Sequence, residues 1–301
     1  MPVTDEATVL GLDLGGSQVK GLAFTADGRV VGEEIGATND QGDHAWRENV
    51  RRVANALTQR HPRVRRIGLC APGLAARDER TIVSMPGRLR GLEGFVWADF
   101  LGLPAVVLND AHAALLGEGW QGAARGRENV LMVTLGTGVG GAALVDGRLL
   151  RGHLGRAGHV GHISLNPDGA PDIVQTPGSL EDAIGECTLA KRSGGRFATT
   201  AALLTAVRNG DAAAAETWQR SLRALSAALA GLINVLDPEI IVIGGGIASA
   251  GEVLFAPLRA TLSAMEWRVG PSGVQLVAAQ LGPRAGAYGA AFHALQTSTP
   301  A

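Results

Sequence analysis

Short apolar runs separated by glycines dominate the first part of the chain. Residues 8–14 are mostly apolar and are followed by two glycines, an apolar stretch over 19–24, the pair Asp27 and Gly28, and two valines at 30–31. This order predicts a strand, a glycine loop, a second strand, a tight turn and a third strand. The same order returns over 130–150. We therefore predict a duplicated unit, with the two copies about 120 residues apart.

The rest of the chain alternates between helical and extended patterns. Between the two copies, helices are predicted over 47–57 and 111–120, and strands over 67–71 and 106–108. After the second copy, Leu and Ile residues form a stripe of helical period over 221–236 that ends at an Asp-Pro pair. A strand is then predicted over 239–243 and a helix over 251–265.

Length and composition narrow the class of protein. A chain of 301 residues usually divides into two lobes, and two lobes imply a cleft. The formal net charge is −1 and the basic residues are dispersed, so no nucleic-acid partner is predicted. The cysteines, Cys70 and Cys187, are too few for a disulfide framework. No signal sequence or membrane-spanning run is evident, which favours a cytoplasmic protein without a membrane partner.

Three predicted strands run into glycine-rich loops. Such loops expose backbone N–H groups and allow a phosphate chain to approach closely. A dinucleotide fold is the rival interpretation, but its glycine loop opens a helix, whereas the first two loops here lead into strands. No P-loop sequence occurs, and each loop taken alone could be an ordinary tight turn. The loop residues are Gly15, Gly16 and Ser17, then Gly136, Thr137 and Gly138, then Gly244, Gly245 and Gly246.

Two carboxylates stand at predicted strand ends. Asp13 lies just before the first glycine loop, where it could hold Mg²⁺ through water near the phosphates of a nucleotide, or merely cap the turn. Asn109 and Asp110 lie between a predicted strand and a predicted helix. A pair at this place is commonly an N-cap. The functional alternative is that Asp110 accepts the proton of a sugar hydroxyl while Asn109 orients the sugar, since phosphoryl transfer asks for one such carboxylate.

Seven segments together resemble the ROK sugar kinases, a family within the actin and hexokinase-like ATPase superfamily. They follow the family's order and span nearly the whole chain: 11–17 (GLDLGGS), 71–73 (APG), 108–111 (LNDA), 135–141 (LGTGVGG), 157–162 (AGHVGH), 243–246 (IGGG) and 286–291 (GAYGAA). The resemblance implies an α/β fold of two ribonuclease-H-like lobes with a cleft between them, ATP and Mg²⁺ as cofactors, closure on a hexose, and a homodimer.

No linker rich in proline or serine occurs, so the lobes are expected to join at the helix after Asp110, with a boundary near Gly117; the resemblance implies that the last helix returns to the N-terminal lobe. The N-terminal lobe is predicted over 1–117 and includes a C-terminal helix at about 288–301, which crosses back to it. The nucleotide- and sugar-binding lobe is predicted over 118–287.

The resemblance assigns roles to single residues as well. Asp110 is similar to the family's catalytic base, and Gly16, Gly138 and Gly245 resemble its nucleotide-contacting glycines. ATP is expected at all three loops and at Asp13, which would hold Mg²⁺ through water. The expected sugar-binding residues are Gly73, Asn109, His159, His162 and Glu181.

The chain departs from the family at two places. His159 stands where the family usually has a Glu that contacts the sugar near its anomeric end, which leaves the identity of the hexose open. The zinc-binding cysteines that commonly follow the family's histidine are missing, because residues 172–181 read DIVQTPGSLE. Glu181, at the end of this stretch, could equally be an acid in the first turn of a helix.

Histidines and aspartates near this stretch could also suggest a metal cluster. Without thiolates, histidines in a glycine-rich loop more often form hydrogen bonds or contact substrate. We therefore predict no structural zinc. The residues concerned are His153, His159, His162, Asp168 and Asp172.

The predicted function is ATP-dependent phosphorylation of a hexose hydroxyl, as in a glucokinase or an N-acetylhexosamine kinase. A ROK repressor would need a winged helix-turn-helix before the first loop, and only ten residues precede Gly11. A non-catalytic sugar-sensing protein is the remaining alternative, which the presence of Asp13, Asp110 and three loops disfavours. Polyphosphate is an alternative donor, because backbone amides recognise phosphate more than base.

Overall fold

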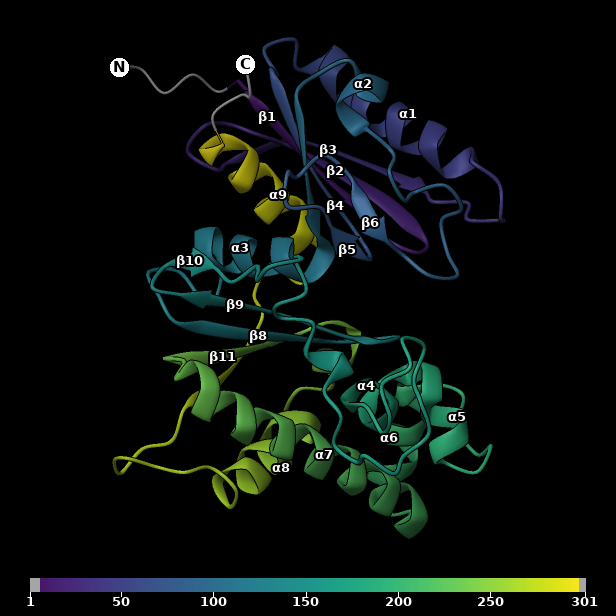
Figure 1. Cartoon of the computed structure of the whole chain (residues 1–301), viewed down its shortest axis with the longest axis vertical. Coiled ribbons are helices and arrows are strands. Elements are labelled where there is room, and N and C mark those ends of the chain that lie inside the picture. Colours follow the sequence, from purple (N-terminus) through teal and green to yellow (C-terminus); the bar gives the residue numbers. More distant parts are fainter. Residues whose placement is uncertain (1–5, 298–301) are drawn as a thin grey trace. The chain divides into compact units, whose positions relative to one another are not determined.

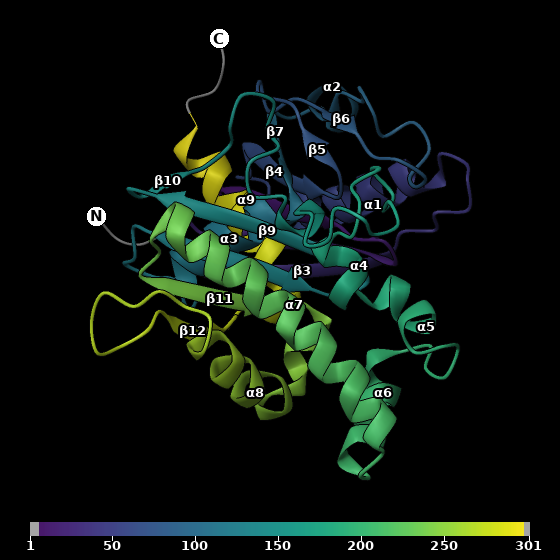
Figure 2. The same cartoon turned by 60° about the horizontal axis from the view of Figure 1, so that its bottom comes forward.

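The structure is a computed structural model, which describes residues 6–297 (Figures 1 and 2). Contacts divide these residues into two units. Unit 1 comprises 6–126, 151–156 and 280–297, and unit 2 comprises 127–150 and 157–279. The chain therefore crosses from one unit to the other after residues 126, 150, 156 and 279. None of the helices within 6–297 combines the length and apolar character needed to cross a bilayer.

Unit 1 is built on a five-stranded sheet. In spatial order its strands are β3 (Val30–Ala37), β2 (Gln18–Phe24), β1 (Val9–Leu14), β4 (Arg66–Ala71) and β7 (Ala105–Asn109). β1 pairs antiparallel with β2 and parallel with β4, and β4 pairs parallel with β7. Parallel strands are usually covered on both faces. In agreement, β1 and β4 are buried along almost their whole length.

Helices cover both faces of this sheet (Figure 1). α1 (Ala45–Arg60) packs an apolar stripe, which includes Trp46 and Val50, into one core together with Leu10 of β1. α9 (Ala285–Gln296) covers the other face, where Ala287 shares a core with Val9 of β1. Successive residues of β1 thus serve opposite faces, as the pleat of a strand requires. The remaining elements of unit 1 are β5 (Leu74–Ala75), β6 (Ile82–Ser84), α2 (Trp97–Leu101), α3 (Asp110–Gln121) and the 3₁₀ turn η4 (Gly282–Arg284).

α9 approaches the sheet and α3 at backbone distance. A Cβ atom on Gly68 of β4 would overlap the carbonyl oxygen of Ala290, and one on Gly289 would overlap the carbonyl oxygen of Ala113 in α3. Glycine is required at both positions because no side chain fits between the backbones. α9 is therefore an integral part of the core of unit 1.

A buried carboxylate fixes the segment that leads into α9. Glu118 of α3 is fully buried, and its Oε1 accepts the backbone amides of Gln280 at 3.0 Å and Leu281 at 2.8 Å. Its Oε2 accepts the amide of Ala123 at 2.7 Å. Backbone donors from two segments thus satisfy a charge that burial would otherwise make unfavourable.

Unit 2 repeats the sheet of unit 1. Its spatial order is β10 (Arg148–Leu149), β9 (Val139–Val145), β8 (Val130–Leu135), β11 (Ile240–Gly244) and β12 (Gln275–Ala278). β8 pairs antiparallel with β9 and parallel with β11, as β1 does with β2 and β4. The predicted duplication is therefore confirmed.

The helices of unit 2 pack their apolar residues into one core. The longest is α7 (Ala212–Leu236), whose predicted stripe includes the buried Leu222, Leu225 and Leu229. α8 (Glu252–Ser263) packs beside it (Figure 2). The shorter elements are the 3₁₀ turns η1 (Val160–His162), η2 (Glu186–Thr188) and η3 (Gly246–Ala250), and helices α4 (Leu180–Ile184), α5 (Leu189–Arg192) and α6 (Thr200–Arg208).

Candidate active site

The site residues predicted in unit 1 gather at the carboxyl ends of three neighbouring strands. Asp13 of β1 pairs in register with Cys70 of β4, and Ala71 of β4 pairs with Asn109 at the end of β7. Asp110 follows at the start of α3. Ligands of open α/β sheets bind at this edge. The strand order thus places two carboxylates from distant parts of the sequence at one such edge.

Asn109 caps α3. Its Oδ1 accepts the backbone amides of Ala111 at 2.9 Å and His112 at 3.2 Å, and its Nδ2 donates to the carbonyl oxygen of Gly73 at 2.9 Å. Asn109 is therefore the N-cap of α3, as one of the two interpretations predicts. Such a cap stabilises a helix by about 1 kcal/mol. The amide of Asn109 also hydrogen-bonds to the carboxylate of Asp110. The same side chain joins Gly73 to the start of α3.

The carboxylate of Asp110 has a raised pKa. Its Oδ1 accepts the amide of Ala111 at 2.7 Å. The residue is accessible to solvent, yet protein surrounds the carboxylate closely enough that loss of hydration raises its pKa to about 6. The hydrogen bonds from Ala111 and Asn109 oppose this rise, and the negative charge of Asp13 adds to it. The carboxylate is thus ionised at neutral pH and is still basic enough to accept a proton.

Asp13 lies in a neighbouring, partly buried environment. Burial raises its pKa, and the Lys20 ammonium and the Cys70 thiol act in the opposite direction. Nζ of Lys20 is 4.0 Å from Oδ2, and Sγ of Cys70 donates to Oδ1 at 3.6 Å. Burial and the two aspartates raise the pKa of the Cys70 thiol well above its usual value, so it stays protonated. A nearby cation would stabilise the ionised carboxylates of Asp13 and Asp110, since opposite charge favours the ionised form.

The first glycine loop is held by residues that the sequence did not indicate. Oγ1 of Thr38 donates to the carbonyl oxygen of Gly15 at 2.7 Å, and the amide of Thr38 donates to Ser17 at 2.9 Å. A Cβ atom on Gly16 would overlap the guanidinium of Arg88. Nε of Arg88 also lies 3.7 Å from Oδ2 of Asp40. The guanidinium of Arg88, paired with the carboxylate of Asp40, therefore contacts this loop.

The second and third glycine loops lie side by side in unit 2. Gly244 pairs with Thr134 at the end of β8. Gly245 has a φ of 83° and lies so close to Leu135 that a Cβ atom would overlap its carbonyl oxygen. Both the backbone angle and the close approach require glycine there. The predicted phosphate loops 136–138 and 244–246 thus lie next to each other at the carboxyl ends of the adjacent strands β8 and β11.

Glu181 and His162 flank the second loop. Oε2 of Glu181 accepts the amide of Val139 at 2.9 Å, directly beside Gly138. The amide of Leu180 donates to the carbonyl oxygen of Ile163 at 3.0 Å, which joins the backbone next to Glu181 to the backbone next to His162. Glu181 is also in the first turn of α4, as the alternative interpretation of this residue predicts. Its Oε1 is not used in the bond to Val139.

The two predicted histidine ligands have different surroundings. His162 ends η1, and its Nδ1 lies 2.8 Å from Oδ2 of Asp172. His159 is half-buried at the start of the same turn, and its carbonyl oxygen accepts the amide of His162 at 3.3 Å. Among residues 6–297, no group of three or more Cys, His, Asp and Glu side chains is arranged to hold a metal ion.

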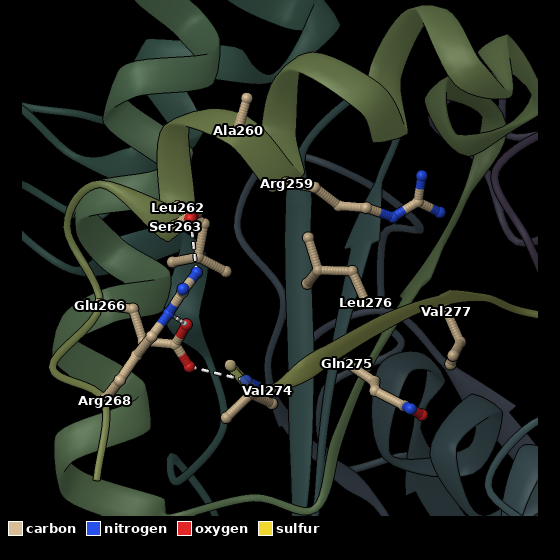
Figure 3. A pocket seen from close by; sticks show the side chains of 11 residues that line it. Arg259, Ala260, Leu262, Ser263, Glu266, Arg268, Val274, Gln275, Leu276 and Val277 are labelled. Atoms are coloured by element: carbon tan, nitrogen blue, oxygen red, sulfur yellow. Dashed lines mark hydrogen bonds and ion pairs between the residues drawn. The ribbon is translucent and has the colours of Figure 1, made fainter. Parts of the chain in front are cut away.

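Figure 3 shows a pocket of unit 2 whose lining includes none of these residues. It measures about 530 Å³ and is lined by α8, β12 and the segment between them. Its arginines are already paired, because Arg268 contacts Glu266 and Ser263, and Arg259 contacts Glu252. None of the predicted site residues lines it. The pocket is therefore not a candidate for the phosphate site.

Known proteins resemble the chain over nearly its whole length. The sequence profile described as the ROK family matches residues 9–297. A glucokinase of Halalkalibacterium halodurans is 32% identical over an alignment that covers 93% of this chain and 92% of that protein. An N-acetylmannosamine kinase of Yersinia pseudotuberculosis is 31% identical over 252 residues, which cover 80% of this chain and 83% of that protein.

A solved structure agrees with these relatives. The crystal structure of a ROK family glucokinase from Streptomyces griseus in complex with glucose and AMPPNP has a TM-score of 0.80 and 28% identity, and the match covers 96% of this chain and 99% of that one. Together with the profile match, this similarity shows that the chain belongs to the ROK family.

Proposed function

We propose that this chain is an ATP-dependent sugar kinase, which transfers the γ-phosphoryl group of ATP to a hydroxyl group of a hexose. The observation that carries the proposal is Asp110, a carboxylate with a pKa of about 6 that lies beside Asp13 at the carboxyl ends of three strands. Relatives named as glucokinase and N-acetylmannosamine kinase support it, as does the related structure with glucose and AMPPNP.

Asp110 is the proposed general base. As the hydroxyl oxygen of the sugar attacks the γ-phosphorus, its O–H bond breaks, the proton passes to Asp110 and ADP leaves. A base is most effective when its pKa lies near the working pH, and burial brings Asp110 toward that range. The rest of the catalysis is positioning and neutralisation of charge.

The phosphates of ATP are proposed to bind at the glycine loops. These loops can offer backbone amides, and the guanidinium of Arg88 adds positive charge at Gly16. Mg²⁺ fits the acidic edge next to the first loop, where Asp13 would hold it through water and the ion would neutralise phosphate oxygens. A water-mediated site of this kind needs only one or two carboxylates from the protein.

The sugar is proposed to contact side chains that are anchored by other bonds. Glu181 has Oε1 and His162 has Nε2 beyond the bonds that anchor them. Asn109, which is bonded to Gly73 and to the carboxylate of Asp110, completes the proposed set together with Gly73 and His159. Anchored side chains lose little rotational freedom on binding, which favours an oriented sugar over a loosely held one.

Further properties extend the proposal. We expect a cytoplasmic protein that forms a homodimer. Light scattering coupled to size exclusion would test the dimer. A non-catalytic, sugar-sensing protein is the second candidate function, and it differs in a measurable way because it would bind hexoses without turnover.

A coupled assay of ADP release tests the function. The purified chain would be offered glucose, mannose, fructose, allose, N-acetylglucosamine and N-acetylmannosamine with ATP and Mg²⁺, and in parallel with polyphosphate as donor and sugar phosphate as readout. We expect turnover with at least one hexose and its loss in Asp110→Asn. Binding of a hexose without phosphorylation from either donor would instead support the sensing protein.

A further inference from the structure

We infer that Asp172 is a positioning residue, which fixes the imidazole of His162 so that Nε2 is the nitrogen offered to the sugar. The inference deepens the proposed function and rests on it for the identity of the ligand. It starts from a contact of 2.8 Å between Nδ1 of His162 and Oδ2 of Asp172.

The carboxylate of Asp172 is built into the fold. Its side chain is fully buried, and Oδ1 accepts the backbone amides of Val174 and Thr176, each at 2.9 Å. The backbone of Asp172 is bonded as well, because its amide donates to Thr176 at 2.9 Å and its carbonyl oxygen accepts from Gln175 at 3.0 Å. One oxygen of the carboxylate thus holds a turn, and the other holds His162.

The charge state of Asp172 determines which nitrogen of His162 carries hydrogen. Burial acts to raise the pKa of Asp172, but the bonds from His162, Thr176, Ser179 and Val174 outweigh it and hold the pKa below its usual value. An ionised carboxylate can only accept hydrogen bonds. Nδ1 of His162 must therefore carry the hydrogen, and Nε2 of the neutral ring is left as an acceptor.

The geometry leaves His162 accessible while it is held. Its side chain is 27% exposed, whereas that of Asp172 is completely enclosed. An acceptor at Nε2 would receive a hydrogen bond from a sugar hydroxyl, and a ring held at Nδ1 cannot turn to offer the other nitrogen. A buried carboxylate orients the histidine of serine proteases by the same physical means.

The substitution Asp172→Asn tests the inference. Asn keeps the size of the side chain and can still accept the amides at Oδ1, but its NH₂ group would face Nδ1 of His162. We expect the tautomer to change, so that Nε2 carries the hydrogen. The KM for the hexose should then rise about tenfold, the effect of losing one hydrogen bond in a desolvated site, with kcat and the KM for ATP changed much less. Asp168→Asn, an exposed aspartate of the same segment, is the matched control.

The tautomer is read by long-range ¹⁵N–¹H NMR of the histidine rings at alkaline pH, where imidazoles are neutral. The His162 signals are assigned by their loss in His162→Gln. An Nδ1–H tautomer in the wild type is expected, and an Nε2–H tautomer would overturn the inference even if Asp172→Asn failed to fold. A folded Asp172→Asn variant with an unchanged tautomer and an unchanged KM would also overturn it.

This test separates the inference from the proposed function. If no hexose is phosphorylated by the wild type, the proposed function fails, while the NMR measurement still decides whether Asp172 sets the tautomer of His162. If turnover is normal and Asp172→Asn raises the KM for ATP as much as that for the hexose, Asp172 acts on the structure in general and the positioning role is refuted.

Discussion

Asp110 gives the clearest dependence on pH. Because catalysis requires its ionised form and its pKa is raised to about 6, kcat/KM for the hexose should be level above about pH 6 and should fall about tenfold per unit below it. The measurement is a pH profile at saturating ATP. A profile that stays level to about pH 4, the usual pKa of an aspartate, would remove Asp110 from the mechanism.

Replacement of Asp110 should separate activity from stability. Asp110→Asn should lower kcat by about two to four orders of magnitude, since the amide cannot accept the proton. A raised pKa means that the stabilising contribution of Asp110 is complete at acid pH and is lost as pH rises through about 6. The variant should therefore melt at a higher temperature than the wild type at about pH 8, and the difference should shrink toward about pH 4.

Calorimetry at both pH values checks this prediction. Asp99→Asn, an exposed aspartate in α2, provides the control for loss of a negative charge from unit 1. A lower melting temperature for Asp110→Asn at the higher pH would show that hydrogen bonding to the carboxylate outweighs its loss of hydration.

His159 is the residue at which we expect sugar preference to change. A neutral imidazole offers one donor and one acceptor, whereas a carboxylate offers acceptors only. If His159 contacts the sugar, His159→Ala should raise the KM for the true substrate several-fold and His159→Glu should shift preference among hexoses. The ratio kcat/KM for the wild type and both variants on one panel of sugars measures this. Relative values that stay constant across the panel would show that His159 does not read the sugar.

The sequence predicts the place of a residue where that place depends on its neighbours along the chain. Asn109 and Asp110 follow a strand and precede a helix, and the structure places them there. The sequence does not predict contacts between distant residues. Thr38 bonds to Gly15 across 23 positions, and Arg88 lies on Gly16 although a loop far along the chain carries it. Local patterns contain no information about such pairs until the strands are ordered in space.

The predicted elements are confirmed at their centres and differ from the structure at their ends. The expected range for α7 is 221–236, but the helix begins at Ala212, because Asp211 caps it and because Ala214 and Trp218 continue its buried face toward the N-terminus. α8 is shorter than its expected range of 251–265 and contains Pro257. Apolar periodicity locates the buried face of a helix, whereas capping and propensity set where the helix stops.

The segment between η1 and α4 leads to a prediction about metal. The turn at 172–177 is held by the hydrogen bonds of one buried carboxylate, Asp172, and carries no thiolate. The purified protein should therefore contain much less than one zinc per chain, and EDTA should leave its melting temperature unchanged. Elemental analysis and thermal melting measure these quantities, with a cysteine-containing ROK protein as positive control. One zinc per chain would show that the His and Asp residues replace the missing thiolates.

The whole molecule repeats one strand order twice, β3-β2-β1-β4-β7 and β10-β9-β8-β11-β12. The expected α/β class with two ribonuclease-H-like lobes is confirmed by this repeat together with the match to a solved ROK structure. The repeat was visible in the sequence because strand, glycine loop and turn recur in order. The sequence does not indicate which parallel strands pair, since their partners are separated by long crossovers.

At this scale we predict a change on binding sugar. The proposed sugar ligands come from both units, with Asn109 and Asp110 in unit 1 and His162 and Glu181 in unit 2. A hexose that contacts both should reduce amide hydrogen exchange where the chain crosses between units, near residues 126, 150, 156 and 279. Hydrogen-exchange mass spectrometry measures this, with a hexose that is not phosphorylated as control. Unchanged exchange with a confirmed substrate would contradict closure.

The position of α9 also has a consequence for synthesis on the ribosome. Val9 of β1 is covered by Ala287 and Ala291, which are made only after all of unit 2. At typical rates of translation, the residues between 126 and 280 take roughly ten to thirty seconds. Throughout that time the face of the first sheet that α9 covers stays without this helix. Asp13 also lacks its close approach to Gly286. The first unit to emerge is therefore the last to be completed, so a nascent or truncated chain should depend on chaperones and should have no activity.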